Sequence, residues 1–89
     1  MNKGAVVVSL CGHDKGKLYV VVGKSEEKLL LCDGKNKKLA SPKVKNEKHL
    51  KDTGREINLS SYNPLYDAHI LKELKSLEKC VDKSFVYNY

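Results

Sequence analysis

The fold of this chain is decided by one stretch near its start, Ala5-Val6-Val7-Val8-Ser9-Leu10-Cys11-Gly12-His13-Asp14-Lys15-Gly16-Lys17-Leu18-Tyr19-Val20-Val21-Val22. Two runs rich in β-forming residues, 5–10 and 18–22, flank a polar loop, 12–17, that holds two glycines and two lysines. The first run alternates with a period of two, which is typical of a strand with one face in a core. The second run is almost continuously apolar. The stretch predicts a β-hairpin whose tip presents positive charge.

Three further strands are expected downstream of this hairpin. Residues 28–32 form a third apolar run between a turn at 23–27 and an Asp33-Gly34 turn signal. A fourth, weaker strand is expected at 37–40, ended by Pro42, and a fifth near 49–51. Five short strands joined by tight turns predict a small, strongly bent barrel, an architecture that leaves no exposed sheet edge.

The last third of the chain has the pattern of a helix. Asn63 is a good helix cap and Pro64 suits the first helical position, so the helix is predicted to begin there. Its apolar positions recur at steps of three and four residues, namely Ile70, Leu74, Leu77 and Val81, with Leu71 at the margin. Its lysines gather on the opposite side, namely Lys72, Lys75, Lys79 and Lys83. We expect the apolar face to pack on the barrel, although a protein partner or a dimer contact would also cover it. Residues 85–89 are either a last strand or a frayed tail.

Positive charge is concentrated in the first part of the chain. Residues 1–56 hold thirteen basic residues against seven acidic ones, whereas residues 57–89 hold four of each, for a formal net charge of +6. Within residues 35–51, seven lysines stand against Glu47 alone. Such a focused positive field favours nucleic acid or another anionic partner, although a lysine-rich face kept for solubility has the same composition.

Composition also excludes several classes of protein. At 89 residues, 40% hydrophobic and 31% charged, the chain fits one small globular domain. No apolar run approaches the roughly 20 residues of a membrane span, and the first residues do not read as a signal peptide. The three cysteines are odd in number and include no Cys-x-x-Cys pair, which is typical of reduced thiols. We therefore expect a cytoplasmic protein with no disulfide framework and no membrane partner.

Residues 6–23, with the loop Gly12-His13-Asp14-Lys15-Gly16-Lys17 at their centre, resemble a KOW motif. This strand-loop-strand element is shared by NusG-type transcription factors and several large-subunit ribosomal proteins. The likeness continues through residues 29–34 and 43–50, where the chain is similar to small KOW-domain proteins related to an archaeal and eukaryotic large-subunit ribosomal protein. The resemblance implies a mainly β protein with a small SH3-like five-stranded barrel at residues 1–56 that binds RNA. Residues 57–89 would add a loop and a C-terminal amphipathic helix packed on the barrel, within a single domain.

Two features depart from the family pattern. The position after Gly12 is often basic in such proteins but is His13 here. Ribosomal members also tend to carry long basic tails, whereas residues 57–89 are neutral in sum. A ribosome-associated protein therefore fits the sequence better than a permanent ribosomal subunit.

The predicted RNA-binding residues lie in the motif loop and in the lysine-rich segment, and they are Gly12, His13, Lys15, Gly16, Lys17, Lys35, Lys37, Lys38, Lys43, Lys45, Lys48 and Lys51. The two glycines let the loop turn through left-handed conformations and let a phosphate approach main-chain N–H groups. Lysine supplies sixteen of the seventeen positive charges, so we expect backbone and shape recognition rather than reading of base edges. Tyr19 and His13 are candidates for stacking on an unpaired base, although Tyr19 is better interpreted as a barrel residue.

Other chemistry has little support in the sequence. The spacing of Cys11, His13 and Cys32 matches no established zinc pattern, so no metal or other cofactor is expected. His49 and His69 have no acidic and nucleophilic partners at triad-like positions, and no enzymatic activity is expected. The sequence thus predicts an RNA-binding protein, with ribosomal RNA or the ribosome as partner. The alternative is an SH3-like protein-interaction module of transcription or translation complexes that uses the barrel groove or the helix.

Overall fold

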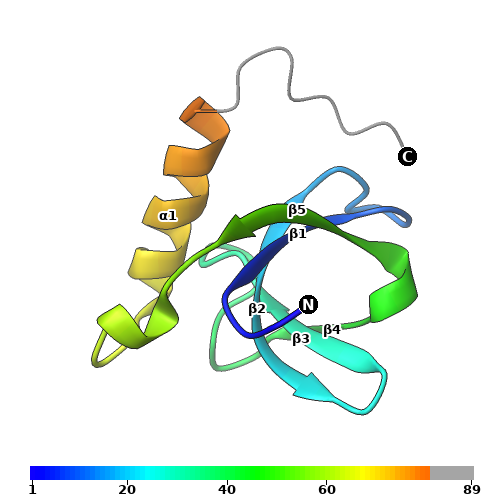
Figure 1. The fold of residues 1–89 in the computed structure, drawn as a ribbon, viewed down its shortest axis with the longest axis horizontal. Coiled ribbons are helices and arrows are strands. Elements are labelled where there is room, and N and C mark those ends of the chain that lie inside the picture. The colour runs from blue at the N-terminus through cyan, green and yellow to red at the C-terminus, as the bar shows by residue number, and fades with distance from the viewer. Residues whose placement is uncertain (81–89) are drawn as a thin grey trace.

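The computed structural model describes residues 1–80, and side chains as far as residue 77 (Figure 1). The fold is mainly β, as the sequence predicts. Its elements are β1 (Ala5–Ser9), β2 (Leu18–Ser25), β3 (Lys28–Cys32), β4 (Lys43–Asn46), the short 3₁₀-helix η1 (Glu47–His49), β5 (Leu50–Glu56), a second 3₁₀-helix η2 (Leu59–Ser61) and α1 (Asp67–Cys80).

The strands form one antiparallel sheet in the order β4-β3-β2-β1-β5. β1 is central, with Val7 opposite Tyr19 of β2 on one side and Asp52 of β5 on the other. The register shifts after Val6 in the β1–β5 pair and between Val21 and Gly23 in the β2–β3 pair, and such irregularities increase the local bend of a strand. The sheet therefore curls, and the short η1 connects its two outer strands (Figure 1). Within residues 1–80 these two strands, β4 and β5, do not pair with each other, so the sheet keeps two edges and is not closed as the predicted barrel would be.

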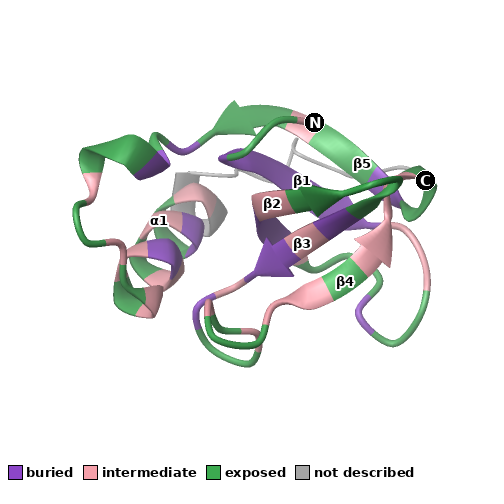
Figure 2. Ribbon diagram, turned by 90° about the horizontal axis from the view of Figure 1, so that it is seen from below, coloured by how far each residue is buried: buried purple, intermediate pink, exposed green. Residues whose placement is uncertain are grey.

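Both faces of the sheet are covered, which explains why every residue of β1 is buried (Figure 2). Alternation along the strands divides the core into two clusters. Inside the curl lie Ala5, Val7, Tyr19, Val21, Leu29, Leu31 and Leu50. On the outer face, the helix and the segment before it pack against the sheet through Val6, Val20, Cys32, Ile57, Leu59, Ile70 and Leu74. The sequence predicted only one buried face for the first strand, because nothing local shows that α1 covers the second.

The predicted fourth strand at residues 37–40 is wrong. These residues belong to the connection between β3 and β4, and the fourth strand starts immediately after Pro42. Proline has no N–H to give to a strand ladder, so it lies just before the strand that pairs with β3. The connection is held compact by Asp33, whose Oδ1 accepts the main-chain N–H groups of Lys35, Asn36 and Lys37 at 2.8–2.9 Å.

Two further boundaries differ from the sequence-based expectation. β2 runs to Ser25, so the expected turn at 23–27 is confined to a tight turn at Glu26, whose φ is +56°. The fifth strand spans seven residues rather than the few expected near 49–51. Pairing with β1 along its length extends it, and one strand cannot reveal such pairing by itself.

The helix begins at Asp67, three residues later than Pro64. The Asn63-Pro64 peptide is cis and belongs to the turn that leads from η2 to the helix. The expected apolar face is confirmed as far as it is described, because Ile70 and Leu74 are buried and Leu77 packs against the same cluster. Val81, Lys83 and residues 85–89 lie outside the described residues. Among the residues described, no helix has the length and apolar character that a bilayer crossing requires.

Candidate nucleic-acid interface

The motif loop connects β1 to β2 and is closed by its own main-chain hydrogen bonds. Gly12 and Gly16 have φ values of +85° and +90°, which a residue with a side chain rarely adopts. The N–H groups of Lys15, Gly16 and Lys17 donate to Gly12, Ser9 and Asp14 carbonyl oxygens, respectively. Because these three amides already have acceptors within the chain, they are not available to a phosphate in this conformation.

Asp14 is the hub of the loop. Its carboxylate is almost buried, with the residue 7% exposed. Oδ1 accepts hydrogen bonds from Ser9 Oγ and Lys45 Nζ, each at 2.9 Å. Oδ2 accepts from the Tyr19 hydroxyl at 3.1 Å and pairs with Lys43 Nζ at 2.9 Å. One carboxylate of the motif loop thus holds two lysines of the edge strand β4.

Charge neutralisation dominates the electrostatics of this hub. Burial alone would raise the pKa of Asp14, but the hydrogen bonds from Lys43, Lys45, Ser9 and Tyr19 outweigh it and hold the pKa well below the ordinary value of 3.8. Burial and the neighbouring Asp14 charge raise the pKa of Tyr19. Asp14 is therefore ionised and Tyr19 protonated at neutral pH.

The two lysines bound to Asp14 differ in what they can still reach. Lys45 Nζ donates to Ser9 Oγ, Cys11 O and Asp14 Oδ1 at 2.7–2.9 Å, which uses all three of its donors, and its side chain is only 11% exposed. The side chain of Lys43 is 29% exposed. Lys45 therefore positions the loop, while Lys43 remains accessible to a ligand.

The two residues predicted as candidates for stacking on a base, Tyr19 and His13, differ in their exposure to solvent. Tyr19 is 2% exposed and its hydroxyl donates a hydrogen bond to Asp14, so it is a core residue and not available for stacking on a base. This agrees with its interpretation from the sequence as a barrel residue. His13 is exposed at the loop tip and can meet a base. Sequence reasoning missed Asp14 and Ser9 as organising residues, because an acidic residue inside a basic loop carries no local sign of its distant partners.

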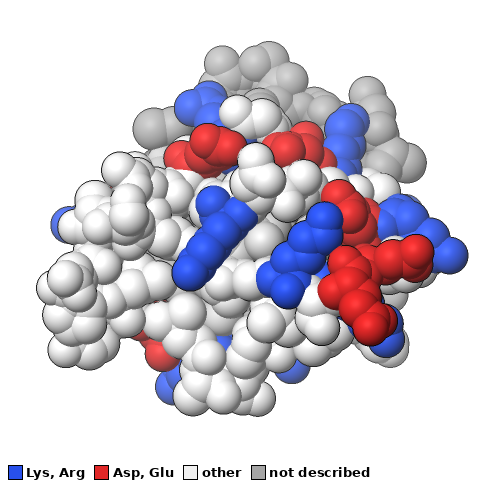
Figure 3. All heavy atoms as spheres, turned by 60° about the horizontal axis from the view of Figure 1, so that its bottom comes forward, with Lys and Arg blue, Asp and Glu red and all other residues white. Residues whose placement is uncertain are grey.

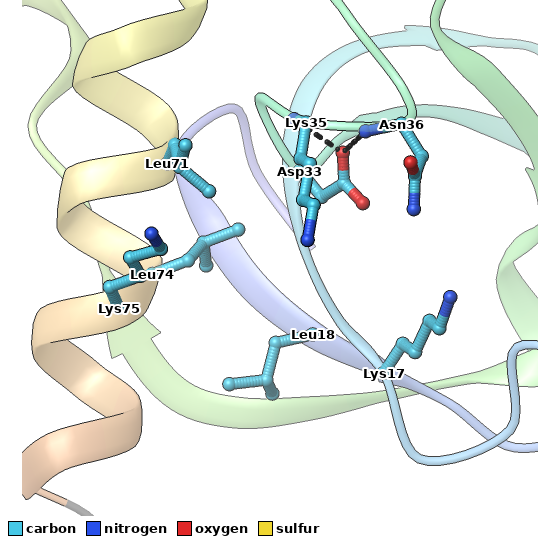
Figure 4. Close-up of a pocket in the computed structure, with 8 residues that line it drawn as sticks. All are labelled: Lys17, Leu18, Asp33, Lys35, Asn36, Leu71, Leu74 and Lys75. Atoms are coloured by element: carbon cyan, nitrogen blue, oxygen red, sulfur yellow. Dashed lines mark hydrogen bonds between the residues drawn. The ribbon is translucent and has the colours of Figure 1, made fainter.

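A second group of side chains comes together where the motif loop enters β2 (Figure 4). Lys17 and Leu18, where the loop enters β2, face Asp33, Lys35 and Asn36 of the β3–β4 connection and Leu71, Leu74 and Lys75 of α1. Together they line an open cavity of about 270 Å³. Lys43 and Lys35 both come from the predicted basic segment, and each lies near a residue of the motif loop, Asp14 and Lys17, respectively.

The remaining predicted RNA-binding residues differ in how close they lie to the Asp14 hub and to the cavity beside Lys17. Lys48 is exposed on η1, next to His49, whose carbonyl accepts the Leu10 N–H at the base of the motif loop. Lys51 is exposed on β5 opposite Val8. Lys37 and Lys38 follow Lys35 in the β3–β4 connection, and within residues 1–80 neither side chain forms an ion pair with the motif loop.

Positive charge is distributed rather than continuous. On the face drawn in Figure 3, basic side chains stand apart from one another among uncharged atoms, with several acidic side chains beside them. The negative charge of Asp14 also offsets part of the charge of Lys43 and Lys45.

Metal binding receives no support from the described part of the chain. Residues 1–80 contain no cluster of three His, Cys, Asp or Glu side chains that could hold an ion. Cys32, which belongs to the Cys11-His13-Cys32 combination considered from the sequence, is buried in the outer cluster. Burial, together with the charges of Asp67 and Asp33, raises the pKa of the Cys32 thiol to about 11. A thiol with this pKa is protonated at neutral pH.

The strand-loop-strand geometry expected for residues 6–23 is present in β1, the loop and β2. The chain as a whole matches no protein-family model, and no curated protein matches it.

Proposed function

We propose that this protein binds structured RNA, with ribosomal RNA or the ribosome as its partner, through the surface around the motif loop. The observation that carries the proposal is the meeting of two segments far apart in sequence. Lys43 and Lys45 contact Asp14 of the motif loop, and Lys35 shares a cavity with Lys17 at its end. Parts of the motif loop and of the lysine-rich segment therefore lie next to each other in space, although they are far apart in sequence.

We further infer that the curved sheet is an SH3-like barrel of the KOW type. The strand order β4-β3-β2-β1-β5 and the single turn of 3₁₀-helix between β4 and β5 favour this architecture, since they bring the ends of the sheet toward each other. The buried inner cluster would then be the interior of the barrel.

Recognition on this surface would be mainly electrostatic. Lysine ammonium groups bind phosphates as point charges and do not fork onto base edges as arginine does. Structured RNA is read largely through phosphates and 2′-hydroxyls, which exposed lysines and His13 can contact. Affinity would come from counterion release, so it depends on salt.

The test is a salt titration of RNA binding. Fluorescence anisotropy with a labelled RNA hairpin gives the slope of log affinity against log salt. The double variant Lys17→Gln/Lys35→Gln should reduce the magnitude of this slope by about two, since each lysine on a phosphate contributes about one. Lys43→Gln should reduce it by less, because Asp14 already offsets its charge.

A matched control is available at the far end of the sheet. Lys24 and Lys28 flank the β2–β3 turn, at the opposite end of β2 from the motif loop. The variant Lys24→Gln/Lys28→Gln removes the same charge and should leave the slope within about 0.5 of the original value. Equal slopes for the two double variants would show that binding follows net charge alone, and the proposed surface would be wrong.

The rival function is a protein-interaction module. Val44 is 54% exposed on the outer strand β4, which is the kind of edge to which an extended peptide can add. Sedimentation with ribosomes before and after RNase treatment separates the two functions. Association that survives RNase and high salt favours the protein partner, whereas association lost in both favours RNA.

A further inference from the structure

The cavity between α1 and the β3–β4 connection combines positive charge with apolar walls. Lys17, Lys35 and Lys75 reach it from three different segments, and Figure 4 shows the first two extending toward the opening between them. The side chains of Leu18, Leu71 and Leu74 form the other wall. Resting on the proposed function, we propose that this cavity binds one 5′-phosphorylated nucleoside, as an unpaired nucleotide of the bound RNA.

Charge selects the anionic part of this ligand. Within the part of the chain that the structure describes, none of the three ammonium groups forms an ion pair, in contrast to Lys43 and Lys45. The only acidic side chain in the lining is Asp33. Its Oδ1 already accepts three main-chain N–H groups, which lowers its power to repel an anion. The cavity therefore has a net positive charge and available donors.

The apolar wall selects the rest of the ligand. A bare phosphate would leave the leucine side chains uncovered, whereas a nucleobase has two apolar faces that can lie against them. Asn36 offers both a donor and an acceptor to a base edge, and Asp33 offers an acceptor to a ribose hydroxyl or an exocyclic amine. A phosphate, a sugar and a base together use every kind of side chain in the lining.

Size limits the ligand to a single nucleotide. The cavity volume of about 270 Å³ is close to the roughly 300 Å³ at which small-molecule sites begin. Lys17 and Lys35 also belong to the proposed RNA surface, so a nucleotide turned out of an RNA helix could enter while its neighbours follow the motif loop. A free mononucleotide has the same chemistry and would occupy the same place.

The first experiment follows amide chemical shifts of the full chain during titration with 5′-AMP, with adenosine, and with inorganic phosphate. 5′-AMP should shift the amides of the cavity lining at millimolar concentration, and adenosine or phosphate alone should do so much more weakly. Lys75→Gln should weaken 5′-AMP binding about fivefold. Lys72→Gln removes the same charge from the same helix outside this cavity and should leave 5′-AMP binding unchanged.

The second experiment separates the two sources of the nucleotide. A hairpin RNA with one bulged nucleotide should bind more tightly than the fully paired hairpin, and Lys75→Gln should remove this preference while Lys72→Gln keeps it. Binding of 5′-AMP in the cavity without any preference for the bulge would assign the site to a free nucleotide instead of RNA.

The inference and the proposed function can fail separately. If both hairpins bind equally in every variant and 5′-AMP leaves the lining unshifted, the cavity takes no nucleotide while RNA binding stands. If neither hairpin binds but 5′-AMP does, the RNA function is wrong and the cavity site stands. Equal loss of 5′-AMP binding in Lys72→Gln and Lys75→Gln would show attraction by net charge alone and would overturn the site.

Discussion

Asp14→Asn should be the most destabilising polar substitution in this protein. The change keeps the shape of the side chain but replaces a charged acceptor with an amide. The amide NH₂ group would take the place of Oδ1 or Oδ2, each of which now accepts from a hydroxyl and an ammonium group. A donor would then face donors, and those hydrogen bonds would be lost. Lys45, whose side chain is 11% exposed, would lose its counter-charge.

The magnitude follows from the two ion pairs. At 2.9 Å and an effective dielectric constant of about 20, each pair has a gross Coulomb energy of about 6 kcal/mol, most of which is offset by desolvation. Removing one partner of a buried pair typically costs about 3–5 kcal/mol. Lys43 is partly exposed and therefore screened, so we expect the lower end, about 3 kcal/mol.

The loss should also depend on pH. Because the pKa of Asp14 is lower in the folded protein than its ordinary value of 3.8, the unfolded chain binds more protons between the two values. The contribution of the carboxylate is complete above about pH 5 and falls as the pH drops below that value. The stability difference between the wild-type protein and Asp14→Asn should therefore shrink from pH 6 to pH 2.

Urea unfolding followed by circular dichroism measures this difference. With a slope of about 1 kcal/mol per molar urea for a domain of this size, the midpoint should fall by about 3 M at pH 7. Asp52→Asn is the control, since Asp52 is exposed and its carboxyl accepts the Gly54 N–H, and we expect a change within about 0.5 kcal/mol. A loss below about 1 kcal/mol for Asp14→Asn, or one equal to the control, would refute the role of this hub.

A double variant keeps the prediction testable if Asp14→Asn unfolds. Most of the expected loss comes from the uncompensated Lys45 ammonium rather than from missing contacts. Asp14→Asn/Lys45→Met removes that ammonium together with its partner and should be more stable than Asp14→Asn alone. A double variant that is less stable would show that the hydrogen bonds of the Lys45 ammonium to Ser9 Oγ and Cys11 O outweigh the cost of its unpaired charge.

Three further predictions concern the packing around α1. Gly34→Ala should lower the free energy of unfolding in urea by about 3 kcal/mol, because a Cβ there would lie 2.4 Å from a carbonyl oxygen of α1. The control Gly54→Ala has a similar φ but nothing within 4 Å of the added Cβ, and it should cost only about 1 kcal/mol. Leu74→Ala should cost about 2–4 kcal/mol by the same assay, and a loss below 1 kcal/mol would show that the helix is loosely packed. Cys32, with its pKa raised to about 11, should react with iodoacetamide far more slowly than Cys11 in the folded protein at pH 8. Mass spectrometry of the labelled peptides measures both rates, and equal rates would show that burial does not protect Cys32.

Much of the fold is local information that the sequence carries. Apolar residues at every second position, or in a short continuous run, place β1, β2 and β3, because side chains of a strand point alternately to its two faces. Steps of three and four residues identify α1 and its buried Ile70 and Leu74. The left-handed conformations of Gly12 and Gly16 were also predictable, because glycine adopts a positive φ without the steric cost that a side chain brings.

Other features depend on partners that are distant along the chain. β4 is polar and partly exposed, and only its pairing with β3 makes it a strand, so its position after Pro42 could not be read from its own residues. The second buried face of β1 exists because α1 packs there.

The candidate site divides in the same way. Composition alone shows that positive charge is concentrated in residues 35–51, and the motif loop identifies the hairpin tip. Which lysines remain available is a question of tertiary structure, because an ammonium group is neutralised by whichever carboxylate folding brings within about 3 Å. Asp14 meets Lys45 across 31 positions of sequence, while Lys17, Lys35 and Lys75 meet around one cavity from three separate segments. The sequence determines where the charges are, and folding decides which of them face each other and which face solvent.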